Sequence, residues 1–153
     1  MSEVVGHAES RVAIAARPIY LLLFPIPVVC FLAALITDVA YYAGADLMWL
    51  HFSQWLIAAG LVFGALAALV LLIEFSASDL MRTKKIGWTH LVLFYACLIV
   101  QLFNAFVHTV DGWTAVVPIG MTLSVVGAIL ALAAVAALFF VPVTWVELRE
   151  VRP

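Results

Sequence analysis

Residues 52–73 read FSQWLIAAGLVFGALAALVLLI, a run that contains no histidine and no charged side chain. An α-helix rises about 1.5 Å per residue, so roughly 20 apolar residues cross the hydrocarbon core of a bilayer, which is about 30 Å thick. Similar runs recur along the chain, because residues 18–37, 91–107 and 112–146 also lack Asp, Glu, Lys, Arg and His. The sequence therefore predicts a chain built from membrane-spanning segments.

We expect four transmembrane helices, near residues 18–43, 52–77, 87–109 and 114–145. Backbone groups without a hydrogen-bond partner are costly in lipid, so a spanning segment is either an α-helix or part of a closed barrel. The alternation of polar and apolar residues that a barrel strand requires is absent. A hydrophobic content of 67% also excludes an ordinary soluble domain. The expected fold is one all-α, antiparallel up-down four-helix bundle integral to the membrane.

The basic residues are confined to one side of this expected bundle. Segments 44–51 and 110–113, which connect spans one to two and three to four, carry none. The basic residues lie before span one, between spans two and three, and after span four: Arg11, Arg17, Arg82, Lys84, Lys85, Arg149 and Arg152. Because Lys and Arg are enriched on the cytoplasmic side of membrane proteins, we expect cytoplasmic termini and a multi-pass protein of the bacterial inner membrane.

The third span concentrates its polar side chains on one helical face. Cys97, Gln101 and Asn104 are spaced by three or four residues, and His90 and His108 extend this polar stripe toward the two ends of the span. Residues at that spacing share one face of an α-helix. Lipid cannot satisfy amide side chains, so we expect the stripe to face the other helices. It would serve either as interhelical hydrogen bonds or as the wall of a cofactor site or proton path.

Glu74 is the intramembrane acid of span two, about one turn from the inner end of that span. A charge within the membrane is costly, so a carboxylate there is a candidate for function. The alternative is that Glu74 reaches the membrane interface or forms an ion pair with Arg82 or Lys85.

Two histidines are candidates for haem ligation. Because spans two and three are antiparallel, His51 and His108 are expected at similar depth, as the axial imidazoles of a b-type haem must be. At about 100° per residue, however, His51 lies on the opposite side of its helix from Gly60, which belongs to a row of small residues. The alternative is that both histidines form hydrogen bonds with Asp38, Asp111 or lipid headgroups.

The sequence contains none of the common motifs of catalytic, phosphate-binding or metal-binding sites. There is no Cys-x-x-Cys pair, phosphate-binding loop, nucleophile motif or zinc-ligand spacing. A formal net charge of −2 argues against a nucleic-acid partner. We therefore expect no catalytic activity of the chain on its own, no metal site, and the lipid bilayer as its surroundings.

Short motifs over about residues 17–108 carry a family resemblance. They are Arg17-Pro18, Phe24-Pro25-Ile26, Asp38, Ser53-Gln54-Trp55-Leu56 before Gly60, Glu74, and Trp88-Thr89-His90. This pattern resembles an uncharacterised family of four-span bacterial membrane proteins, domain of unknown function 2231. The chain departs from the family where Arg17 replaces a histidine, Glu74 an aspartate and Phe94 an asparagine. A cofactor held through that first histidine could not be held in the same way here.

The resemblance implies a redox setting, because relatives of this family occur fused to iron–sulfur or cytochrome domains. We expect a small subunit that anchors or assists a membrane redox complex, with a membrane or periplasmic redox protein or a second copy as its partner. Two alternatives stay open. One is an electron-transfer subunit that binds a b-type haem or a quinone near His108 and His51, or near His90 and Glu74. The other is an oligomeric pathway for protons or small solutes.

Overall fold

A computed structural model describes residues 18–77, 85–110 and 112–139. Every regular element within these ranges is an α-helix: α2 (Pro18–Leu23), α3 (Pro25–Gly44), α4 (Leu47–Ala77), α6 (Lys85–His108), α7 (Trp113–Val116) and α8 (Ile119–Phe139). Four segments are long and apolar enough to cross a membrane: Ile19–Gly44, Leu47–Ala77, Trp88–His108 and Trp113–Leu138. The expected all-α, four-span fold is confirmed. The cytoplasmic placement of both termini stays a prediction, and the basic residues other than Lys85 lie outside the described residues.

A proline and the turn between α3 and α4 determine where α2, α3 and α4 begin and end. α2 and α3 meet at Phe24, immediately before Pro25, whose ring removes a backbone N–H from the helical ladder. α3 ends where Ala45 adopts a left-handed conformation, with φ of 51°, and its N–H bonds to the carbonyl of Tyr41 at 2.7 Å. The Asp46 carboxylate then accepts the N–H of Met48 at 2.9 Å, so α4 begins earlier than the span expected from residue 52.

The fourth span is interrupted near its start. α7 ends at Val116, and α8 begins at Ile119, directly after Pro118. Proline cannot donate the N–H that would continue the ladder from α7. The span expected at 114–145 does not include this break, and its last residues, 140–145, lie outside the described part of the chain.

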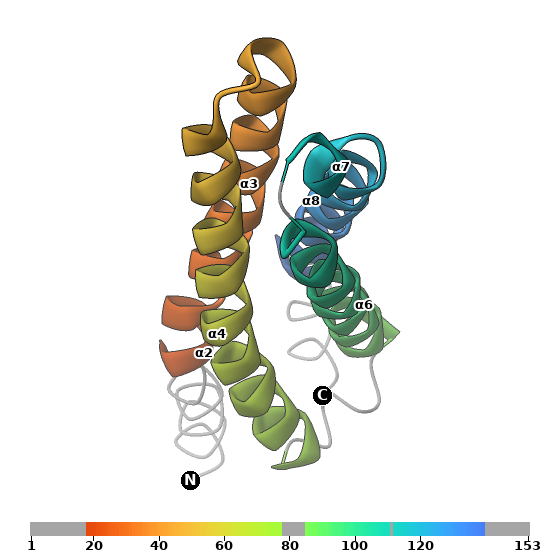
Figure 1. The fold of residues 1–153 in the computed structure, drawn as a ribbon. Coiled ribbons are helices and arrows are strands. Elements are labelled where there is room, and N and C mark those ends of the chain that lie inside the picture. The colour runs from red at the N-terminus through yellow and green to blue at the C-terminus, as the bar shows by residue number, and fades with distance from the viewer. Residues whose placement is uncertain (1–17, 78–84, 111, 140–153) are drawn as a thin grey trace, which may run out of the picture.

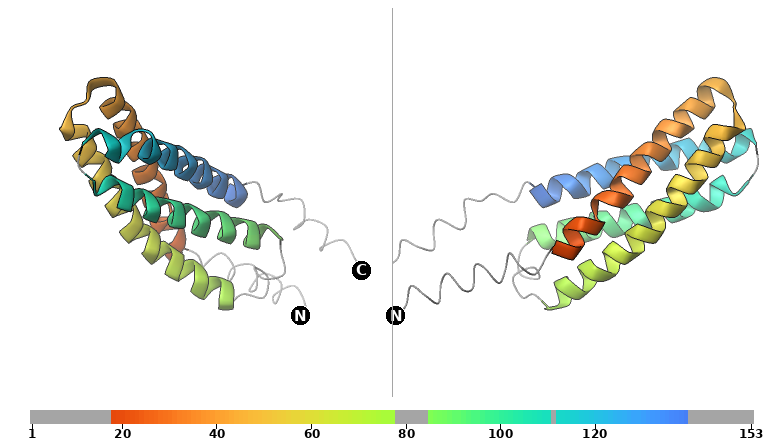
Figure 2. Two further views of the ribbon diagram at one scale, coloured as in Figure 1. Left: turned by 45° about the vertical axis from the view of Figure 1, so that its right-hand side comes forward. Right: turned by 90° about the vertical axis from the view of Figure 1, so that its left-hand side faces the viewer.

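The helices form two hairpins that pack against each other (Figures 1 and 2). The first hairpin is α2, α3 and α4, and the second is α6, α7 and α8. Contact is more extensive within each hairpin than between them, where α3 faces α8 and α4 faces α6. We call the end that holds the α3–α4 turn and α7 the α7 end, and the opposite end the α2 end.

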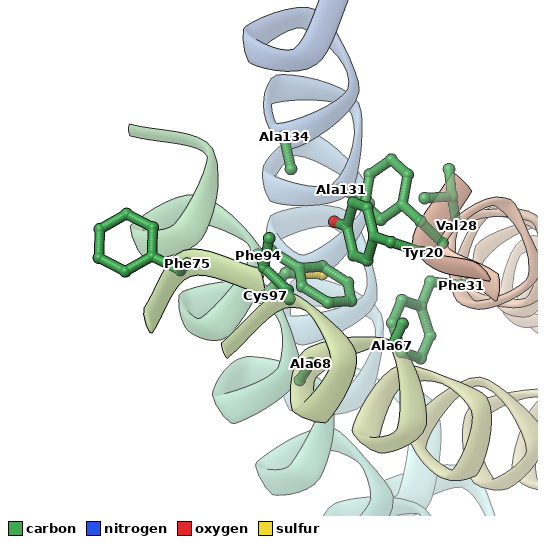
Figure 3. Packing of buried hydrophobic residues seen from close by; sticks show 12 residues of the cluster. Tyr20, Val28, Phe31, Ala67, Ala68, Phe75, Phe94, Cys97, Ala131 and Ala134 are labelled. Atoms are coloured by element: carbon green, nitrogen blue, oxygen red, sulfur yellow. The ribbon is translucent and has the colours of Figure 1, made fainter. Parts of the chain in front are cut away.

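The interior contains two apolar clusters. The larger one fills the bundle from its middle to the α2 end and draws residues from both hairpins (Figure 3): Tyr20, Phe24, Val28, Phe31, Ala67, Ala68, Leu71, Phe75, Phe94, Cys97, Ala131 and Ala134. The smaller cluster closes the α7 end and consists of Tyr41, Leu50, Ala115 and Val116. The polar residues that surround Asp38 lie between the two clusters.

Candidate functional site: a buried polar cluster at the α7 end

Asp38 is the centre of a polar cluster that receives side chains from all four spans. Its side chain is fully buried, and α3 continues for six more residues to Gly44, a distance of about 9 Å. The Ser124 hydroxyl of α8 donates to Asp38 Oδ2 at 2.5 Å, and the Ser53 hydroxyl of α4 donates to Oδ1. His108 Nε2 of α6 lies 3.1 Å from the same Oδ1. Together with Asn104, these residues form what we call the Asp38 cluster.

Further hydrogen bonds orient the members of the Asp38 cluster. Asn104 Nδ2 donates to Ser124 Oγ at 2.8 Å and to Gln101 Oε1 at 3.0 Å. His108 Nδ1 donates to the backbone carbonyl of Asn104 at 3.0 Å. The carbonyl of His108, the last residue of α6, accepts Gln54 Nε2 at 2.5 Å. Within the described residues, Gln101 Nε2 and Asn104 Oδ1 have no hydrogen-bond partner.

Glycines of α8 make room for the polar side chains of α6. A Cβ atom on Gly127 would lie 2.7 Å from Cδ of Gln101, and one on Gly120 would lie 2.9 Å from Cε1 of His108. Both distances are below the contact distance of two carbon atoms. The small residues therefore let α8 approach α6 closely enough for the amide and imidazole groups to fit between the helices.

A second polar contact lies toward the α2 end. The Tyr20 hydroxyl bonds to Nε2 of His90, and His90 Nδ1 donates to the carbonyl of Ala134 at 2.8 Å. The Glu74 side chain, half-buried on α4, lies within electrostatic range of the Tyr20 hydroxyl. This contact joins α2 to α6 and α8. Hydrogen bonds between side chains therefore connect the two hairpins at both ends of their interface.

An apolar interval separates these two polar sites. His90 and His108 are 18 residues apart on α6, which corresponds to about 27 Å. Phe94 and Cys97 occupy the buried face between His90 and Gln101, and each is 1% exposed. Phe94 packs on Phe24 with ring centroids 5.2 Å apart, and the Cys97 thiol donates to the Gly127 carbonyl at 3.3 Å. The described side chains therefore form no continuous polar line along α6.

The structure places the sequence-predicted residues in three groups. Gln101, Asn104 and His108 of the polar stripe come together at Asp38, while His90 joins Tyr20. His51 is exposed on α4, in an open groove that it lines with Met48, Phe52 and Trp55. His51 and His108 are therefore not brought together.

Sequence reasoning missed Ser53, Ser124 and Tyr20 as site residues, and it considered Asp38 only as a partner of the histidines. The sequence did contain a signal for Asp38. It is a carboxylate within six residues of the end of one predicted span, and His108 lies at the same end of another predicted span.

Comparison with models of protein families assigns the chain to one family. A family model described as predicted membrane protein (DUF2231) matches residues 16–140, so the match runs beyond the predicted range of residues 17–108 and covers the fourth span. The chain belongs to this family. Neither a curated protein nor a solved structure matches it.

The described histidines of this DUF2231 protein do not fit a haem with two imidazole ligands. An axial imidazole binds iron through an unprotonated ring nitrogen. Both ring nitrogens of His108 and both ring nitrogens of His90 are already in hydrogen bonds, and His51 is exposed outside the bundle interior. Among the described residues there is also no group of three or more His, Cys, Asp or Glu side chains that could hold a metal ion.

Proposed function

We propose that this protein is a non-catalytic subunit that anchors or assists a redox complex in the bacterial inner membrane. The observation that supports this role best is that the buried polar stripe is used for contacts between helices. Asp38, Asn104 and His108 bond to one another and to serines of the neighbouring helices. Such an interior suits a stable scaffold, and the redox setting comes from the family resemblance.

The surface at the α7 end is the proposed docking surface for the partner. Met48, His51, Phe52 and Trp55 follow one another at helical spacing along one face of α4. Trp55 is 76% exposed, and tryptophan is one of the residue types enriched among those that contribute most to protein binding. The distribution of basic residues predicts that this end lies on the outer side, where a periplasmic or membrane redox protein would contact it.

The two alternative functions have less support. Electron transfer through a b-type haem would require His108 or His90 to give up a hydrogen bond that each now makes. The apolar interval at Phe94 and Cys97 interrupts the polar side chains within one chain, so an oligomeric pathway for protons or small solutes would have to run between copies of the chain. A quinone near Glu74 and His90 would have to displace the Tyr20 hydroxyl from His90.

Replacing Trp55 by alanine is expected to release the partner without unfolding the bundle. The full-length protein is purified from native membranes in mild detergent, and visible absorption is recorded on the co-purifying material. The wild type should retain a partner that carries a haem or iron–sulfur absorbance, and Trp55→Ala should lose that absorbance, because its indole is the most exposed large side chain of the groove.

Phe103→Ala is the matched control, because Phe103 is an exposed aromatic residue of α6 that does not line the groove. Phe103→Ala should retain the partner and its absorbance. Loss of the partner in both variants, or its retention in both, would count against docking at this groove. A wild type that never captures a redox partner would refute the proposed function.

A further inference from the structure

The Asp38 cluster bridges the two hairpins. Asp38 and Ser53 belong to the first hairpin, whereas His108 and Ser124 belong to the second. The contacts of Asp38 with His108 and Ser124 therefore cross the interface between hairpins. Contact across this interface is less extensive than within each hairpin, and these hydrogen bonds lie on it.

The hydrogen bonds of His108 fix where its ring protons lie. Nδ1 faces the Asn104 carbonyl oxygen at 3.0 Å, and a carbonyl oxygen can only accept a hydrogen bond. Nδ1 therefore carries a proton. On the other side of the ring, Nε2 lies 3.1 Å from Asp38 Oδ1. Without a proton between them, two lone pairs would face each other in a fully buried site.

A proton between Nε2 and Oδ1 makes the pair neutral overall. It can be written as an imidazolium beside a carboxylate or as an imidazole beside a carboxylic acid, and both forms contain the same number of protons. The serine hydroxyls favour the first form, because Ser53 and Ser124 both donate to the carboxylate. A buried site with net charge would be costly in the membrane. The stable state is therefore the neutral pair, with one proton between Nε2 of His108 and Oδ1 of Asp38.

We propose that Asp38 and His108 form a binding site for one proton, and that this proton holds the two hairpins together at the α7 end. Its removal would leave a carboxylate against a ring-nitrogen lone pair at the contact that joins α3 to α6. The bundle binds this proton when the two hairpins are in contact at the α7 end.

The neighbouring elements bring few other titratable groups to this site. α7 and α8 contain none. α3 contributes Tyr41, which lies in the apolar cluster at the α7 end. α4 contributes His51, which is exposed, and Asp46 is exposed in the turn before α4. Asp111 lies outside the described residues. Among the described residues, Asp38 and His108 are therefore the buried titratable side chains of this site.

The proton can be counted directly in the full-length protein in lipid nanodiscs at neutral pH. Nitrogen NMR of ¹⁵N-labelled histidine reports which ring nitrogens carry protons, and infrared absorption reports whether Asp38 is a carboxylic acid. We expect His108 to carry protons on both nitrogens, or else a single proton on Nδ1 together with a protonated Asp38. In Asp38→Asn the second ring proton or the acid band should disappear, and the exposed Asp46→Asn should leave both unchanged.

A wild type in which His108 carries one ring proton while Asp38 is ionised would overturn the proposal. This measurement needs no folded Asp38 variant, because the His108 signal can also be assigned by replacing each of the other histidines with glutamine. The second part of the proposal, that this proton holds the two hairpins together, is tested by raising the pH until the same spectra show that the proton between Asp38 and His108 has been lost. Resistance to unfolding by a denaturing detergent should fall over the same interval, and an unchanged resistance would refute it.

Discussion

Asp38→Ala is expected to lower the free energy of unfolding by about 3–5 kcal/mol, the range found when one partner of a buried ion pair is removed. The substitution leaves His108, Ser53 and Ser124 buried without the carboxylate that each now contacts. Asp38→Asn should cost less, because its amide oxygen still accepts a hydrogen bond. Equilibrium unfolding in mixed micelles with a denaturing detergent measures the difference.

Asp46→Ala is the matched control for this prediction. Asp46 is an acid at the same end of the bundle, but it is exposed, and its described side-chain hydrogen bond is to the N–H of Met48. We expect no large change in the stability of this variant. Equal losses in Asp38→Ala and Asp46→Ala would mean that the Asp38 cluster does not hold the bundle together.

Gly120→Ala is expected to destabilise the bundle by about 1–3 kcal/mol, the usual cost of overpacking a well-filled interior. The added methyl group would overlap the Ala115 carbonyl oxygen and lie 2.9 Å from Cε1 of His108. The carbonyl belongs to the backbone of α7, so relief requires α7 and α8 to move apart, which also disturbs His108. The same unfolding assay measures the loss.

Gly44→Ala provides the comparison for Gly120→Ala. Gly44 ends α3, and a Cβ atom there would meet no atom within 4 Å. Its stability should stay close to that of the wild type. If Gly120→Ala were equally well tolerated, the close packing of α7, α8 and His108 would be wrong.

The spans were predictable because the bilayer sets both their length and their composition. Runs such as residues 52–73 have one compact solution in lipid, the helix. The break at Pro118 was harder to predict, because proline is well tolerated in the first turn of a helix and does not by itself announce an interruption. The early start of α4 had a signal in Asp46, whose carboxylate accepts the N–H of Met48.

The polar face of α6 was also predictable, whereas its partners were not. Helical spacing puts Gln101, Asn104 and His108 on one side, and all three are buried. Spacing within one helix does not say how its neighbours are rotated, so it could not select Ser124 of α8 as the residue that bridges Asn104 and Asp38. For the same reason similar depth suggested pairing His51 with His108, although His51 faces outward.

A double-mutant cycle between Asp38 and His108 tests most directly whether this pair ties the hairpins together. The free energy of unfolding is measured for the wild type, Asp38→Ala, His108→Ala and the double variant. Because the two side chains meet at 3.1 Å in a fully buried site, we predict a coupling of about 1–3 kcal/mol, with the double variant less destabilised than the sum of the single ones. Losses that add to within about 0.5 kcal/mol, as for distant and independent sites, would contradict it.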